Sequence, residues 1–322
     1  ICLASSVFAD TLIVTNALDS GAGSLRDTLA SASDGDVINF AAALDGATIT
    51  LTTVDPQQKG LSIEDLDVTI DASALTKGIT LSGDHAQRVF TIIGDSNVSL
   101  KQLTMTDGEI AGNGGALFFQ AASLSVTDCV IQNSVASANG GGAYIGNTSN
   151  SSVSFLRCRI QGCSATSSFS GGIYFIGGGQ YSITSSVVSG NFAFSGAGIF
   201  NLSAAPSILN CAVQGNRASV NAGGGMTTDS VTAGASVLIP LIRNSIFWGN
   251  RGIGTTNVAS QQLRNVNNSK PDVNHSLVEA ATGTGSFSDG NKTTWGVNNL
   301  NGITNSPSFV AASTSASAPT SA

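Results

Sequence analysis

Residues Ser186–Asn191 read SVVSGN, and the same six-residue phrase occurs at four other places in the chain. The other copies are CVIQNS (Cys129–Ser134), CRIQGC (Cys158–Cys163), CAVQGN (Cys211–Asn216) and SIFWGN (Ser245–Asn250). The first residues of the five copies are 29, 28, 25 and 34 positions apart, and each is either cysteine or serine.

A second phrase, built on paired glycines, alternates strictly with the first. Its copies are GGALF, GGAYI, GGIYF, AGIFN and GGMTT. The second glycine of each copy recurs at intervals of 27, 30, 26 and 27 residues, at Gly115, Gly142, Gly172, Gly198 and Gly225. Two phrases that alternate at a fixed period define an internal repeat of about 27 residues, which is typical of a solenoid.

The repeat has neither the leucine pattern of leucine-rich repeats nor a 3.6-residue apolar period. It contains short alternating segments such as Leu124–Val126 and Val153–Phe155, separated by Gly and Asn. We therefore predict an all-β fold, a right-handed single-stranded parallel β-helix with about three strands per coil. Equivalent residues then stack from coil to coil, about 4.8 Å apart. A tight interior corner explains the exchange of cysteine and serine, which are nearly isosteric, and Gly-Asn fits a turn with positive φ.

Short strand patterns also precede the regular phrases, for example Val68–Ile70 and Leu103–Met105. Before them, Ser24 and Asp27 form a capping box, which predicts a short helix from Ser24 to about Ser33 that covers the open end of the solenoid. We divide the chain into the end of a signal peptide (1–9), an N-terminal cap with the first strands (10–60), the β-helix (61–310) and a low-complexity Ser/Ala/Thr tail or linker (311–322).

The composition indicates a folded protein with an uncharged surface. Only 10% of residues are charged while 41% are hydrophobic, and the net charge is −7. Basic residues are scattered singly, which argues against nucleic acid as a partner. The start ICLASSVFAD resembles the end of a secretory signal, with cleavage expected before Asp10, and no apolar run is long enough for a transmembrane helix. We expect a secreted, cell-surface or outer-membrane location.

Several segments carry a family resemblance. Asp19–Phe40, DSGAGSLRDTLASASDGDVINF, resembles the N-terminal segment of bacterial right-handed β-helix surface proteins, and Arg88–Phe90 and Leu103–Gly108 fit the same group. The alternating phrases resemble polymorphic outer-membrane proteins of the chlamydial type, an autotransporter passenger domain; NSIFWGN followed by SPSFV (Ser306–Val310) resembles how such coils end. The resemblance covers roughly residues 10–310 and implies an adhesin. Whether a membrane barrel or anchor follows residue 322 is left open.

The acidic residues give little support for catalysis. Between Ala111 and Ser260 the only acids are Asp128 and Asp229, about four coils apart, too far for the carboxylate pair of a glycosidase. Acids are denser in the N-terminal third, where most lie in turns: Glu64, Asp65, Asp67, Asp71, Asp84, Asp95, Asp107 and Glu109. A calcium site there is an option that no motif supports, so we predict no cofactor and no metal. His85 and His275 stand alone, outside any zinc or triad pattern.

Cysteine placement predicts reduced, buried thiols. Cys129, Cys158 and Cys211 belong to the stacked column, whose parallel side chains disfavour disulfides, and Cys163 has no explanation in the pattern. Disulfide formation by any of the four, and the oligomeric state, are left open.

One set of residues is a candidate binding site. Two residues after the key glycine come Leu117, Tyr144, Tyr174, Phe200 and Thr227. If the residues between (Ala116, Ala143, Ile173, Ile199 and Met226) point inward, then Tyr144, Tyr174 and Phe200 form an exposed aromatic ladder that could bind sugar rings or an apolar partner. The alternative is that the ladder packs against a loop or stabilises itself.

The resemblance, rather than the residue spacing, implies a non-enzymatic, adhesin-like β-helix protein that presents an extended surface to host or cell-surface glycans or proteins. Two alternatives stay open. One is a carbohydrate-active enzyme resembling a polysaccharide lyase, which would use the acidic N-terminal third. The other is a purely structural envelope protein without a ligand.

Overall fold

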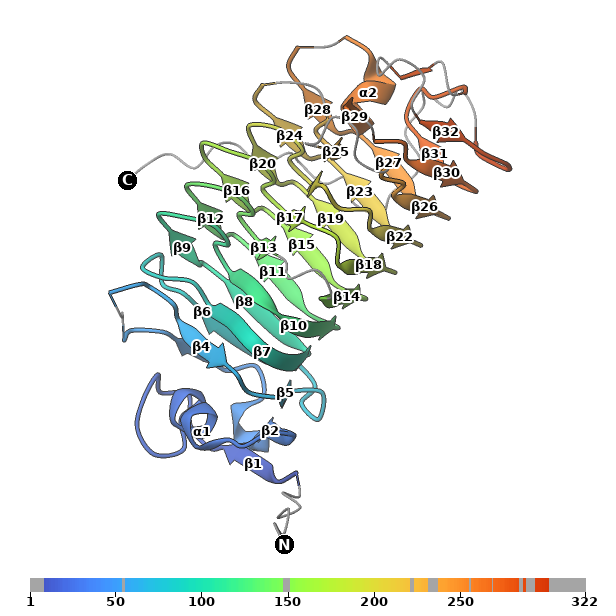
Figure 1. The fold of residues 1–322 in the computed structure, drawn as a ribbon. Coiled ribbons are helices and arrows are strands. Elements are labelled where there is room, and N and C mark those ends of the chain that lie inside the picture. Colours follow the sequence, from blue (N-terminus) through green and yellow to red (C-terminus); the bar gives the residue numbers. More distant parts are fainter. Residues whose placement is uncertain are drawn as a thin grey trace, which may run out of the picture.

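The computed structural model describes residues 9–53, 56–146, 151–220, 223–230, 237–254, 256–267, 269–283, 286–287 and 293–300. Within them the chain coils into a parallel β-helix, and every strand pair is parallel. Figure 1 shows the coils stacked from the N-terminal end, in blue, to the C-terminal end, in orange and red. The predicted β-helix is confirmed. Residues 1–8 of the expected signal peptide (1–9), the SPSFV segment and the tail lie outside the described residues.

The largest sheet has 17 strands, which pair in two rows. The first row contains β1 (Thr11–Val14), β2 (Asp36–Phe40), β5 (Val68–Asp71), β7 (Phe90–Lys101), β10 (Leu117–Thr127), β14 (Ser152–Leu156), β18 (Gln180–Thr184), β22 (Ser207–Leu209), β26 (Leu241–Arg243), β30 (Asp272–Asn274) and β32 (Thr294–Trp295). The second row meets the first halves of β7 and β10 and contains β4 (Leu61–Glu64), β13 (Ala143–Ile145), β17 (Ile173–Ile176), β21 (Ile199–Leu202), β25 (Met226–Ser230) and β29 (Leu263–Asn267).

Two smaller sheets complete the coil. A nine-stranded sheet takes one strand from each coil: β3 (Thr48–Thr50), β6 (Ile79–Ser82), β8 (Leu103–Thr106), β11 (Val130–Gln132), β15 (Arg159–Gln161), β19 (Val187–Ser189), β23 (Ala212–Gln214), β27 (Ile246–Trp248) and β31 (Leu277–Val278). A six-stranded sheet contains β9 (Glu109–Ile110), β12 (Val135–Ala136), β16 (Ser164–Ala165), β20 (Phe192–Ala193), β24 (Arg217–Ala218) and β28 (Arg251–Gly252).

Helix α1 (Leu25–Ser31) lies at the N-terminal end of the stack, where the sequence predicted a capping helix (Figure 1). Ser24 is its N-cap, and its side chain accepts a hydrogen bond from the backbone N–H of Asp27. Leu25 and Leu29 are buried in the main core, which joins the helix to the first coils. A 3₁₀ turn (Ala42–Leu44) and the short helix α2 (Val258–Gln262) follow further along the chain.

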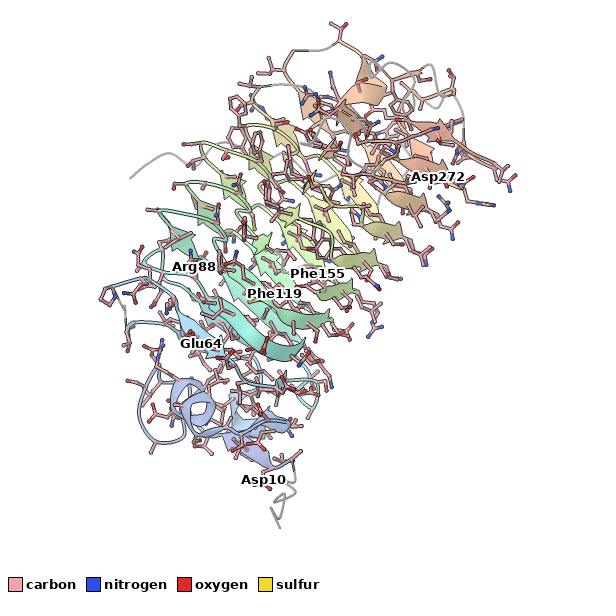
Figure 2. The ribbon with its side chains drawn as sticks, in the orientation of Figure 1. Asp10, Glu64, Arg88, Phe119, Phe155 and Asp272 are labelled. Atoms are coloured by element: carbon pink, nitrogen blue, oxygen red, sulfur yellow. The ribbon has the colours of Figure 1, made fainter. Side chains whose placement is uncertain are left out.

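The core fills the interior of the coils. Alternate residues of each strand point inward, so equivalent apolar residues of successive coils stack. Phe119 and Phe155 are fully buried side chains of this core, and Figure 2 places both in the middle of the stack.

The cysteine–serine column is confirmed and is fully buried. The backbone N–H of Cys158 donates to Ser186 Oγ at 2.9 Å, and that of Cys211 donates to Ser245 Oγ at 3.2 Å. Each side chain also donates to the carbonyl oxygen two residues earlier in its own coil, as Cys211 Sγ does to Leu209 O at 3.2 Å. A small side chain with one donor and one acceptor satisfies this position, and both cysteine and serine qualify.

The last residue of the phrase forms a second buried column. Asn191, Asn216 and Asn250 stack there, with amide-to-amide hydrogen bonds of 2.9 Å between neighbours. Asn216 Nδ2 also donates to Val188 O at 3.0 Å, so each amide ties three coils together. Cys163, which the pattern left unexplained, occupies this same column, because its backbone N–H donates to Asn191 Oδ1 at 2.9 Å.

The predicted glycine column is confirmed as a close approach between coils for Gly142, Gly172, Gly198 and Gly225. Gly115 is one position out of register, and Ala116 takes its place opposite Gly142. A Cβ added to Gly172 would lie 2.3 Å from Gly198 O, far inside van der Waals contact. The four thiols of Cys129, Cys158, Cys163 and Cys211 are buried and free. Burial raises the pKa of Cys158 and Cys211 to about 11, which keeps both thiols protonated at neutral pH.

Candidate functional site

An uninterrupted column of hydroxyl side chains runs along the outer face of the first row. In β10, Leu124 and Val126 point into the core while Ser125 points outward. Strand register places one residue per coil in line with Ser125, and six successive coils contribute a hydroxyl: Thr69, Ser99, Ser125, Ser154, Ser182 and Ser207. We call these six residues the hydroxyl column.

The hydroxyl column ends at an apolar residue on each side. Val37 precedes Thr69 in the register, and Leu241 follows Ser207. All six hydroxyl residues are half-buried, and none of their side chains has a hydrogen-bond partner among the described residues. They contrast with Ser123 on the same strand, whose Oγ donates to Asn97 Oδ1 at 2.7 Å. The hydroxyl column is therefore a row of unused donors and acceptors.

The first four members of the hydroxyl column line a surface groove of about 420 Å³. The groove extends across successive coils, from Gly35 and Asp67 near the N-terminal end to Ser152 and Ser154, so it follows the axis of the solenoid. Its walls are hydroxyl and amide groups with short apolar patches.

The carboxylates at and beside the groove already accept hydrogen bonds. Asp67 Oδ1 accepts hydrogen bonds from the backbone N–H and Nδ2 of Asn97, both at 2.8 Å. Asp71, which borders the hydroxyl column, forms an ion pair with Lys101 at 2.9 Å. Burial raises the pKa of Asp71, but hydrogen bonds from Ser73 and Lys101 outweigh it and the pKa lies below its ordinary value. The Asp71 carboxylate is therefore held as an anion, not as a proton donor.

The sequence analysis missed this column as a site, although a signal was present. Counting back four residues from the first position of the phrase gives Ser125, Ser154, Ser182 and Ser207 for four of the five copies, and Leu241 for the fifth. A recurrent serine at a fixed offset predicts an aligned row on one face of a solenoid.

The predicted aromatic ladder exists, but it is not exposed. Tyr144 stacks on Tyr174, and Tyr174 on Phe200, each with ring centroids 5.5 Å apart. The three side chains are only 9%, 3% and 3% exposed, and Phe169 covers Phe200 at 4.5 Å. The expectation of an exposed ladder is wrong, because Phe169, which lies in a loop, packs on it. A role of the ladder in binding stays a prediction.

The ladder also begins with a different residue from the one expected. Phe118, not Leu117, pairs with Tyr144, and their rings stack at 5.2 Å. Leu117 instead pairs with Ala143 in the inward column. The first glycine phrase has one more residue before its strand than the later copies, which shifts the register by one.

The predicted acids are dispersed. Asp128 pairs with Arg157 at 2.7 Å, and Asp229 accepts from Asn267 Nδ2 at 2.6 Å. Asp128 follows β10 and Asp229 lies in β25, four coils further along, as the sequence predicted. Among the described residues, no group of three or more His, Cys, Asp or Glu could hold a metal ion.

A second hollow brings together residues that the sequence analysis treated separately. His85 Nδ1 lies 3.6 Å from Glu109 Oε2, and His85 Nε2 lies 3.9 Å from Asp107 Oδ1. His85 and Glu109 border a cavity of about 320 Å³ with Gln58 and Thr166. His85 is therefore not isolated, but its imidazole is largely exposed.

Comparisons with known proteins add little. No family model matches the chain, and no curated protein matches it. A solved structure described as "Crystal structure of pectate lyase Pel9A" matches with 13% sequence identity and a TM-score of 0.39, covering 91% of this chain and 68% of that one. At that level the match carries no argument about activity. In the part of the chain that the structure describes, no helix is long and apolar enough to cross a membrane.

Proposed function

We propose that the protein is a non-enzymatic, secreted or cell-surface β-helix protein of the adhesin or passenger type that binds glycans along the hydroxyl column. The observation that carries the proposal is the row of six outward hydroxyls without partners among the described residues, the first four of which line a groove. Serine and threonine hydroxyls both donate and accept, which suits the hydroxyl groups of sugars.

The paired charges support binding over catalysis at this groove. Acid–base cleavage of a glycoside needs two carboxyl groups at a set separation, one of which must carry a proton. Asp71 is ion-paired with Lys101 and its pKa is lowered, so it does not carry the proton that such a pair needs. A secreted location is supported by the low charge content and by the signal-like start of the chain.

The experiment is a glycan array probed with the intact protein. The double variant Ser125→Leu/Ser154→Leu replaces two adjacent hydroxyls with side chains of a type already found outward on this face at Leu156. Its control, Gln132→Leu/Gln161→Leu, makes the matching change on the same two coils but in the nine-stranded sheet. We expect glycan binding that the first variant abolishes and the control retains. Absence of any glycan binding, or equal loss in both variants, would contradict the proposal.

A second candidate function is favoured by one observation, the two carboxylates beside His85. An imidazole between two carboxylates is a common acid–base arrangement, and it lies in the acidic N-terminal third where the lyase-like alternative would place its chemistry. Assays on polyuronides and neutral polysaccharides, with and without calcium, test it. Cleavage that is lost in His85→Ala would replace the binding proposal with an enzymatic one.

A further inference from the structure

The hydroxyl column has a definite direction and a definite length. Its members occupy one position on each of six successive coils, from Thr69 to Ser207. Paired strands lie about 4.8 Å apart, so the column presents one hydroxyl at each such step along the axis. Val37 and Leu241 end it on either side. A ligand that uses the whole column must be a linear polymer that runs along the axis and whose units repeat at about the spacing of one coil.

The shape of the face restricts the type of polymer. The hydroxyls lie on one parallel sheet, and the groove follows that sheet across several coils. Chains of β-1,4-linked hexoses are straight, flat ribbons whose rise per sugar is close to the separation of neighbouring strands. Chains of α-1,4-linked glucose curl into helices, so after a few sugars such a chain no longer follows a straight row of contacts.

The charge of the face restricts the type of sugar. Asp67 lines the groove, and Lys101 beside it is neutralised by Asp71. The chain carries a net charge of −7. A polyuronate would meet a carboxylate and no unpaired cation among the described lining residues, so its charge is disfavoured. Neutral sugars, in contrast, lose nothing by approaching hydroxyl and amide groups.

We propose that the hydroxyl column binds an unbranched, neutral, β-1,4-linked hexose polymer that lies parallel to the solenoid axis, with one sugar per coil and up to six sugars in contact. This inference rests on the proposed glycan-binding function and names its ligand class.

The test measures affinity by calorimetry for cello-oligosaccharides and chito-oligosaccharides of two to eight sugars. Maltohexaose and hexagalacturonate serve as the curled and the charged comparisons. We expect affinity for at least one β-1,4 series to rise with length up to six sugars and then level off. One hydrogen bond gained per coil corresponds to about a 2- to 10-fold step per sugar.

A single variant probes the continuity of the column. Ser154→Leu divides the six hydroxyls into Thr69, Ser99 and Ser125 on one side and Ser182 and Ser207 on the other. It is expected to reduce affinity for the hexasaccharide to about that for the trisaccharide, while affinity for the trisaccharide hardly changes. The control Gln161→Leu, on the same coil, should preserve the full length dependence.

The outcomes separate the ligand class from the general function. Affinity that does not increase with length, or preference for maltohexaose or hexagalacturonate, overturns the ligand class. If the protein binds one of these other glycans and Ser125→Leu/Ser154→Leu abolishes that binding, the proposal of glycan binding at the groove stands. If no glycan on the array or in the series binds, both proposals fail.

Discussion

Two columns of small polar residues run through the same coils and differ in how their hydroxyls are used. In the interior column, Ser186 and Ser245 donate to carbonyl oxygens of their own coils and accept from backbone N–H groups of the preceding coil. In the exterior hydroxyl column, Ser182 and Ser207 have no such partners among the described residues, although each lies four positions before an interior member. The interior hydroxyls are used by the fold, whereas no described residue uses the hydrogen-bonding capacity of the exterior ones.

The largest expected effect comes from breaking the interior asparagine column. Asn216→Leu removes the acceptor of Asn191 Nδ2 and the donors to Val188 O and Asn250 Oδ1, all of which are buried. Leaving several buried polar groups unpaired is expected to lower the free energy of unfolding by about 3–5 kcal/mol. Chemical denaturation followed by circular dichroism measures it.

The matching control is on the exterior. Gln180→Leu changes a polar side chain to the same apolar one at an exposed position of β18 and is expected to alter stability by no more than about 0.5 kcal/mol. Equal losses in Asn216→Leu and Gln180→Leu would refute the distinction between interior and exterior columns.

The next effect is a loss of stability at alkaline pH. Burial raises the pKa of Cys158 and Cys211 from the ordinary 9.0 to about 11. Between these values the unfolded chain releases the thiol proton while the folded chain retains it. Stability is therefore complete below pH 9 and falls as pH rises towards 11, by up to about 2–3 kcal/mol per thiol. Melting temperatures measured from pH 7 to 11 test this decline.

Serine does not titrate in this range, so a double substitution isolates the thiols. Cys158→Ser/Cys211→Ser should lose less of its melting temperature between pH 8.5 and 10.5 than the native protein. Because the pKa values of Cys129, Cys163 and Tyr181 are also raised, part of the alkaline decline should remain in both proteins. Identical pH profiles would show that these thiols do not drive the alkaline loss.

The sequence predicted the columns well where the repeat itself marked the stacked position. Gly172 and Gly198 approach closely because a phrase repeated once per coil returns each residue to the same place, and backbone contact there admits only glycine. The same reasoning located the interior cysteines and serines. It also predicted α1 from its capping box, because that signal is local.

The predictions failed where contacts depend on something outside the repeat. One additional residue before β10 shifted Leu117 inward and Phe118 into the aromatic ladder. Phe169 lies in a loop between β16 and β17, and its packing on Phe200 could not be inferred from alternation within strands. His85 meets Glu109 because turns of neighbouring coils lie side by side, a relation that motif spacing does not encode.

A smaller effect is expected when an interior residue is exchanged for its alternative. Cys211→Ser keeps the donor to Ile183 O and Leu209 O and the acceptor for the backbone N–H of Ser186. It is expected to lower the free energy of unfolding by less than about 1 kcal/mol at pH 7, since only the packing contacts of the larger sulfur atom are lost. Cys211→Ala, which removes the hydrogen bonds, should cost more, about 1–3 kcal/mol. If Cys211→Ser had a lower denaturation midpoint than Cys211→Ala, the hydrogen bonds of the interior column would not contribute to stability as described.

The smallest effect is expected in the exterior column, and it separates structure from function most clearly. Ser125→Val removes a hydroxyl that no described residue uses, and it places a β-branched side chain on a half-buried strand face, where such residues are favoured. The free energy of unfolding should change by no more than about 0.5 kcal/mol. Because valine favours strands, we expect a slight increase in stability rather than a decrease. Denaturation of Ser125→Val beside the native protein measures the change. A loss above about 1 kcal/mol would mean that the exterior serines also hold the coils together. The free hydroxyls would then be a requirement of the fold, and the main argument for a glycan in the groove would disappear.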